Sequence, residues 1–151
     1  MTYPTQAVAD TINEHFVPVQ VNTQDGSGAA LVERYRQVWT PDLRVLGADG
    51  FELYRWNGYL PPYEFLPQLL VGLGQAHLRM HDEPRAAATF GQVIRDYPTS
   101  AAAPEAEYYY AVSTYKQSHQ PSDLAGNWDR LRRDHPESTW RVRQSFSENQ
   151  S

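Results

Sequence analysis

His77 and His81 have the spacing in this sequence that comes nearest to a metal site. Four residues apart on a predicted helix, they would present two imidazoles on one face, and Asp82 and Glu83 follow directly. A third ligand is not evident. The favoured interpretation is a packed or surface histidine at each position, so we predict no metal site.

Other chemistry that would make this chain an enzyme is missing from the sequence. The chain has no cysteine, which excludes disulfides, thiolate nucleophiles, zinc fingers and iron–sulfur ligation. No Ser-His-Asp order, glycine-rich phosphate loop or carboxylate pair rises above chance. We therefore expect no catalytic residue and no cofactor, which favours a non-catalytic protein.

Arginines are concentrated near the end of the chain, where Arg130, Arg132 and Arg133 lie among acidic residues such as Asp129 and Asp134. A solvated helix face with ion pairs is the ordinary interpretation of such a run. Contact with an acidic segment of a partner protein is the alternative. These three arginines are therefore a candidate partner-binding site.

Charge and hydropathy narrow the class of partner. The 151 residues include 18 acidic and 13 basic ones, a net charge of −5, whereas general nucleic-acid binders have a basic surface. The longest apolar stretch, residues 66–78, is too short to span a bilayer. Residues 1–6 lack the basic start and apolar stretch of a secretory signal. We expect a cytoplasmic protein that binds neither nucleic acid nor membrane.

The elements expected in the first half are helix, strand, helix, strand, strand. Residues 5–15 have the apolar spacing of a helix, and residues 16–22, with valine at alternate positions, predict a strand. A second helix is expected over residues 29–38. Residues 42–46 and 51–56 then form the arms of a hairpin, joined by a glycine-containing turn.

The second half is expected to be helical throughout. A long helix from Pro62 to about Met80 is apolar on more than one face, which predicts a buried position between the two halves. An internal repeat follows, because the run DYPTS at residues 96–100 recurs as DHPES at residues 134–138. Small or apolar residues at matching positions of the two units predict stacked helix pairs.

These units resemble tetratricopeptide repeats. In the second unit Val112 and Leu124 replace the glycine and the alanine of that family, and the spacing exceeds the usual 34 residues. The resemblance covers about residues 62–145 and implies antiparallel helix pairs that hold protein segments. The family's positions are filled in the first unit by Leu70, Leu73, Gly74, Ala86, Phe90 and Pro98.

The first half resembles the later part of a thioredoxin-like domain. The resemblance is carried by residues 13–19, the Trp-Thr-Pro junction at 39–41, the hairpin turn at 48–50 and the Asn-Gly-Tyr run at 57–59. That family's Cys-x-x-Cys motif, first strand, first helix and central strand have no counterpart here. The resemblance therefore covers residues 3–80 and only the later part of the fold.

This second resemblance implies a binding site. It implies that Pro41 is a cis-proline and that the backbone just before it pairs with an extended segment of a bound protein. Trp39, Thr40 and Pro41 are therefore a candidate peptide-binding site. A proline that merely opens a strand is the alternative interpretation.

We predict an α+β fold in which a partial thioredoxin-like sheet of three strands packs on an all-α tetratricopeptide-like region. The first part spans residues 1–80, the second residues 62–151, and the helix at 62–80 is shared. The expected function is a non-catalytic, redox-inactive protein-interaction module. The alternative is a truncated thiol–disulfide oxidoreductase whose Cys-x-x-Cys end lies upstream of Met1.

The absent central strand leads to an expectation about assembly. Without it, residues 16–22 and 42–46 must either pair directly or leave an open sheet edge, which invites pairing with another chain. We expect a homodimer through this edge, and a rearranged three-stranded sheet is the alternative. The expected partners are thus a protein or peptide segment, or a second copy of the chain.

Overall fold

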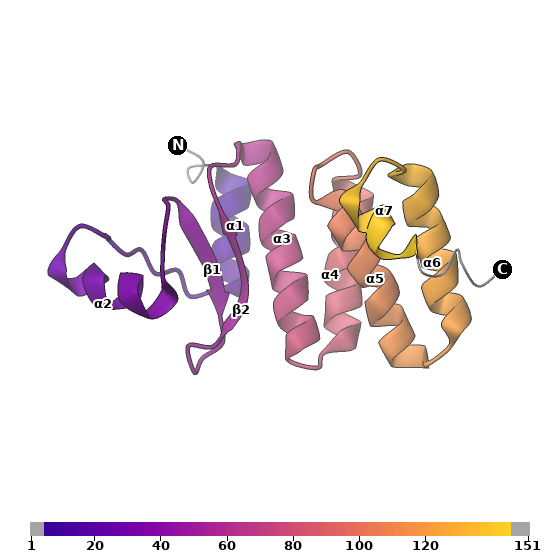
Figure 1. Ribbon diagram of the computed structural model, residues 1–151, viewed down its shortest axis with the longest axis horizontal. Helices are drawn as coiled ribbons and strands as arrows, with labels where there is room; N and C mark the ends of the chain where they lie inside the picture. The colour runs from indigo at the N-terminus through magenta and orange to yellow at the C-terminus, as the bar shows by residue number, and fades with distance from the viewer. Residues whose placement is uncertain (1–4, 146–151) are drawn as a thin grey trace.

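Seven helices and one β-hairpin make up the described part of the chain, residues 5–145 of a computed structural model. The helices α3 to α6 stand side by side, and the hairpin lies against α3 at one end of this row (Figure 1). The elements in chain order are α1 (Gln6–His15), α2 (Gly26–Tyr35), β1 (Asp42–Leu46), β2 (Glu52–Asn57), α3 (Pro62–Arg79), α4 (Glu83–Asp96), α5 (Ala103–Ser118), α6 (Pro121–Asp134) and α7 (Thr139–Arg143).

The hairpin forms where the sequence predicts it. β1 and β2 pair antiparallel, with Val45 opposite Tyr54 and Leu46 opposite Glu52, so that Leu53 is an extra residue that bulges from β2. In the turn, Gly50 has φ +78°, a backbone conformation that glycine adopts without steric cost. The hairpin is therefore determined by local turn chemistry and alternating side chains.

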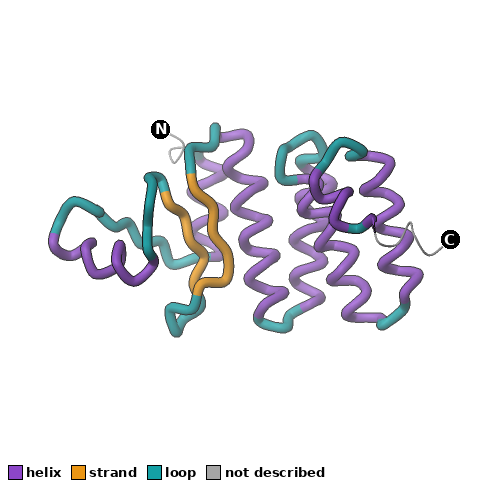
Figure 2. Tube along the Cα trace, viewed as in Figure 1, coloured by secondary structure: helices purple, strands orange, loops and turns teal. Residues whose placement is uncertain are grey.

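The prediction of a three-stranded sheet, and with it the thioredoxin-like fold class, is wrong. The chain is mostly helical, and the described residues contain a single sheet of two strands, β1 and β2 (Figure 2). Residues 16–22 are irregular, and Val17 and Val19 are 90% and 79% exposed. A strand needs backbone partners as well as alternating side chains, and among the described residues no backbone hydrogen bond reaches residues 17–21.

α3 is the central element of the molecule. It begins at Pro62, keeps Pro67 within its first turns, and is buried from Phe65 to Ala76 except at Gln68, which is partly exposed. A Cβ at Gly72 would lie 3.1 Å from the Tyr54 ring of β2. On another side of α3, a Cβ at Gly74 would lie 2.6 Å from the Phe90 ring of α4. The two glycines therefore let the hairpin and α4 approach the same helix closely.

The remaining helices form antiparallel pairs, α3 with α4 and α5 with α6, as the repeat predicts. Two pairs of residues 38 positions apart occupy equivalent buried places. Phe90 on α4 and Trp128 on α6 are 0% and 4% exposed, and Val93 and Leu131 are both fully buried. The helical packing is thus consistent with two stacked units.

α2 lies apart from the rest of the molecule (Figure 1). Asp25 caps its start by accepting a hydrogen bond from the Gly28 N–H at 2.9 Å, and Arg36, directly after the last helical residue, has φ 48°. Its apolar residues Leu31 and Val32 are only partly covered. The helix is joined to the hairpin mainly through Tyr35 at its C-terminal end.

Between residues 5 and 145, none of the helices has both the length and the apolar character that crossing a bilayer requires.

Candidate peptide-binding surface

The outer edge of β1 is the surface to which the sequence analysis leads. The Gly58 N–H donates to the Pro41 carbonyl at 2.9 Å, so Pro41 points toward β2. Because strand residues alternate, Leu43 and Val45 also point toward β2. The backbone N–H and C=O groups of Asp42, Arg44 and Leu46 therefore point outward, and we call these groups the β1 edge.

The β1 edge has no backbone partner in the described part of the chain. The side chains of Asp42, Arg44 and Leu46 share one face of the hairpin, opposite to the face that packs on α3. Leu46 is 40% exposed. An unpaired strand edge is a template on which an extended polypeptide can add by backbone hydrogen bonds.

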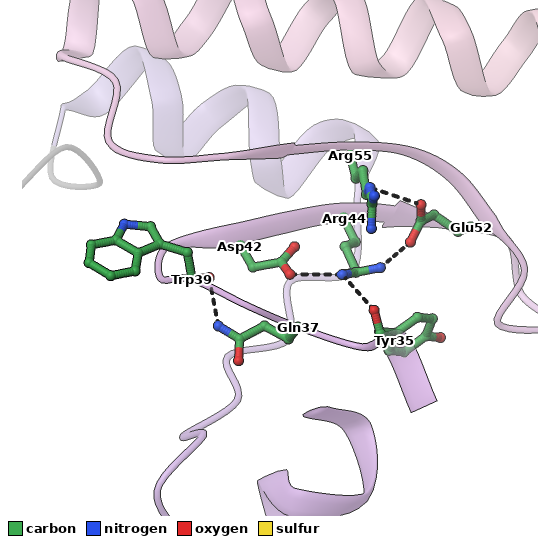
Figure 3. A network of polar contacts seen from close by, with 7 residues as sticks. All are labelled: Tyr35, Gln37, Trp39, Asp42, Arg44, Glu52 and Arg55. Carbon is green, nitrogen blue, oxygen red and sulfur yellow. Dashed lines mark hydrogen bonds and ion pairs between the residues drawn. The ribbon is translucent and has the colours of Figure 1, made fainter. Parts of the chain in front are cut away.

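Charges beside the β1 edge are neutralised within the chain (Figure 3). Arg44 donates to Asp42 Oδ2 at 2.7 Å and to the Tyr35 carbonyl at 3.0 Å, and it also pairs with Glu52. Its guanidinium lies 4.9 Å from the centre of the Tyr35 ring, within cation–π range. The hydrogen bond to Asp42 raises the pKa of Arg44. The edge therefore presents backbone groups without a free charge.

The sequence analysis did not identify this ion network. The side chains of Asp42 and Arg44 are only 6% and 11% exposed. Glu52 and Tyr35 complete the network from β2 and α2. The signal was present in the opposite charges of Asp42, Arg44 and Glu52, which share one face of the hairpin. What covers that face could not be predicted.

Trp39, Thr40 and Pro41 lie directly before β1. The Thr40–Pro41 bond is cis, which confirms the expectation drawn from the resemblance. Gln37 Nε2 donates to the Trp39 carbonyl at 2.6 Å, and the Trp39 side chain is 70% exposed (Figure 3). The structure thus places an accessible aromatic side chain next to the β1 edge.

The arginine cluster lies elsewhere, on α6. Arg130 is 3.6 Å from the buried Glu107 carboxylate of α5 and 3.4 Å from Asp134. Arg133 lies 3.0 Å from Asp134, and Arg132 pairs with Asp129. These contacts are the ion pairs expected of a solvated helix face. The positive charges are largely compensated inside the chain.

The two histidines are not assembled into a metal centre. His77 is partly buried, and this burial lowers its pKa, while His81 follows α3 with φ 60° and its side chain lies 4.0 Å from Glu83. Within residues 5–145, no three histidine or carboxylate side chains gather closely enough to bind a metal ion.

Comparison of the sequence and structure with known proteins identifies no relative of this chain. No protein-family model, no curated protein and no solved structure matches the chain. The resemblances to tetratricopeptide repeats and to part of a thioredoxin-like domain therefore stay predictions from the sequence. Any functional conclusion must come from the geometry of the β1 edge.

Proposed function

We propose that the chain is a non-catalytic protein-interaction module that binds an extended protein segment along the β1 edge. The observation that carries this proposal is the row of outward N–H and C=O groups at Asp42, Arg44 and Leu46, which no backbone group of the described residues satisfies. Strand addition would satisfy these groups, and backbone hydrogen bonds would supply affinity with little dependence on sequence.

Side chains around the edge would supply the specificity. Trp39 and Val38, which precede the start of β1, are 70% and 84% exposed, and Leu46 at the other end of the strand is 40% exposed. Aromatic residues are frequent among the side chains that contribute most to binding. Because Arg44 is already paired with Asp42 and Glu52, the segment that fits best is apolar and uncharged where it crosses the edge.

The helical half supports this role as a scaffold. α3 buries the opposite face of the hairpin, while α4 to α6 extend from it as stacked antiparallel helices. A rigid support of this kind holds a binding edge in place. The tetratricopeptide-like character of these helices is part of the proposal and is supported by the equivalent burial of Phe90 and Trp128.

A second candidate function is a thiol–disulfide oxidoreductase of which this chain is the later part. The open edge of β1, which begins directly after Pro41, favours it, because the thioredoxin-like resemblance implies an active site beside the position of this proline. Reading the gene upstream of Met1 tests this candidate. An in-frame Cys-x-x-Cys would support it, and a stop codon with no such motif would rule it out.

Peptide selection tests the main proposal. A phage-displayed library of short peptides is selected against the immobilised full chain, and the binding of selected peptides is followed by tryptophan fluorescence and amide hydrogen exchange. We expect the amides of Asp42, Arg44 and Leu46 to gain protection. Trp39→Ala should weaken binding by about tenfold, the factor typical of an aromatic contact at the centre of an interface.

Tyr63→Ala is the matched control, because Tyr63 is an equally accessible aromatic residue, 73% exposed, on α3. It should leave the affinity unchanged. Peptides that bind without protecting the three β1 amides, or that respond equally to both substitutions, would place the binding site elsewhere and refute the proposal.

A further inference from the structure

We propose that the segment occupying the β1 edge is residues 16–22 of a second copy of this chain, and that two copies exchange these segments reciprocally. This inference rests on the proposed function, because it uses the same edge, and it names the partner. It differs in requiring that the chain itself supplies both the edge and the added strand.

Residues 16–22 have the character of a strand without a sheet. The segment follows α1 and begins in extended conformation at Phe16, with φ −135° and ψ 157°. Its three valines, Val17, Val19 and Val21, are 90%, 79% and 37% exposed, although valine is among the residues most enriched in strands. In the described part of the chain, no backbone hydrogen bond reaches residues 17–21. The segment therefore has the same unsatisfied groups as the β1 edge.

Residues 16–22 and the β1 edge are compatible in charge and composition. Residues 16–22 contain no charged side chain, and the ionic groups beside the β1 edge are paired with one another. A neutral strand on a compensated edge loses no ion pair and leaves no charge unpaired. Valines covering Leu46 would also remove apolar surface from water.

Pro18 determines the register. Proline has no N–H to donate, so it must occupy a position that points away from the neighbouring strand. Val17, Val19 and Val21 then point their backbone groups toward β1, opposite the three outward residues Asp42, Arg44 and Leu46. The N–H of Gln20 points away from the ladder. This register puts the three valine side chains on the same face as Leu46.

A two-fold arrangement closes this interaction. Each copy offers one segment and one β1 edge, so a reciprocal pair of copies occupies both at once. Two added strands double the number of backbone hydrogen bonds lost when the pair dissociates. Dimerisation would thus cover apolar side chains that a monomer leaves in water.

Light scattering of the full chain over a wide range of concentrations tests the proposal. We expect a concentration-dependent dimer. Val19→Pro removes an N–H that points into the ladder and should raise the dissociation constant by about tenfold or more, since each dimer loses two hydrogen bonds. Gln20→Pro is the matched control, because it removes an N–H that points away, and it should change the constant by less than about threefold.

Unfolding midpoints verify that both variants fold, since both positions are exposed and unpaired in the monomer. Val19→Lys, which brings a charge onto the ladder, is a second disrupting variant with an intact N–H. Hydrogen exchange should protect the amides of Val17, Val19 and Val21 in the dimer and leave that of Gln20 unprotected.

A monomer at every concentration, or a dimer that Val19→Pro leaves intact, would overturn this inference. So would equal effects of Val19→Pro and Gln20→Pro. Its failure is separable from that of the proposed function. A selected peptide that protects Asp42 and Arg44 in a monomeric protein would keep the proposed function and reject the self-association.

Discussion

The hydroxyl of Tyr54 lies 3.0 Å from both carboxylate oxygens of Glu105 and donates a hydrogen bond to this carboxylate. Tyr54 belongs to β2 and Glu105 to the first turn of α5, so the bond joins the hairpin to the helical half. From α3, Gln68 donates to the Tyr54 hydroxyl at 2.9 Å and Gln75 donates to the Glu105 carboxylate at 3.2 Å. Burial raises the pKa of Glu105. A partly buried polar network therefore connects three elements.

Removing the Tyr54 hydroxyl should destabilise the protein. Tyr54→Phe keeps the ring and leaves Glu105 with one donor fewer, so we expect a loss of about 1.5–3 kcal/mol in the free energy of unfolding, as for hydrogen bonds to charged groups. Urea unfolding measures it. Tyr63→Phe, at an exposed position, should have no effect. An unchanged free energy for Tyr54→Phe would show that the bond contributes no net stability.

The two halves should unfold together. Leu69 and Leu73 are 6% and 7% exposed on α3, the helix that contacts both the hairpin and α4. Truncation of either residue to alanine should cost about 2–5 kcal/mol and should keep a single transition in calorimetry. Two separate transitions, or a nearly neutral Leu73→Ala, would instead describe two independent domains.

Two glycines on helices should respond oppositely to alanine. A Cβ at Gly74 would lie 2.6 Å from the fully buried Phe90 ring, so Gly74→Ala should destabilise by about 1–3 kcal/mol through overpacking. At Gly126 of α6, nothing lies within 4 Å of an added Cβ. Gly126→Ala should stabilise by about 0.5–1 kcal/mol because alanine favours the helix. Thermal unfolding of both variants measures the contrast, and the same sign for both would contradict it.

Glu107 should make stability depend on pH. Burial raises its pKa from 4.5 to about 7. The charged or titratable groups around it are Arg130, Arg133 and Asp134 of α6 and His135 directly after that helix. A carboxyl with a raised pKa binds its proton more tightly in the folded state. Its contribution to stability therefore declines as the pH rises from about 4.5 to about 7.

Burial lowers the pKa of His135, so this histidine makes stability depend on pH in the opposite direction. The Glu107→Gln variant separates the two effects, because it removes the titration of Glu107 and keeps that of His135. We expect the variant to gain stability relative to the unmodified chain as the pH rises from 5 to 8, a range that spans the raised pKa of about 7. Unfolding midpoints across this range measure the difference. Glu137→Gln, at an exposed position, should show no such trend, and a pH-independent difference for Glu107→Gln would disprove the assignment.

The chain should have no thiol–disulfide exchange activity. Exchange requires an attacking thiolate, and the sequence has no cysteine. In an insulin-reduction assay with dithiothreitol, the protein should not accelerate the reaction beyond the reagent alone. A clear acceleration would contradict this prediction.

Local elements of this protein were predictable because nearby residues specify them. The hairpin follows from alternating apolar residues around a turn in which Gly50 adopts positive φ. α3 begins at Pro62 and α6 at Pro121, since proline is tolerated in a first helical turn. The repeat predicted the matching buried positions of Phe90 and Trp128, because helix periodicity selects the face that is buried.

Features that depend on residues far apart in the sequence were decided by the tertiary structure. Residues 16–22 have the pattern of a strand, but a strand exists only where another backbone meets it, and none of the described residues does so. The side chains of Asp42 and Arg44 are largely buried. The Tyr35 carbonyl accepts a hydrogen bond from Arg44, and Glu52 forms an ion pair with it. Periodicity reports which side chains share a face. It does not report which distant segment lies on that face, and this choice determines the open edge of β1.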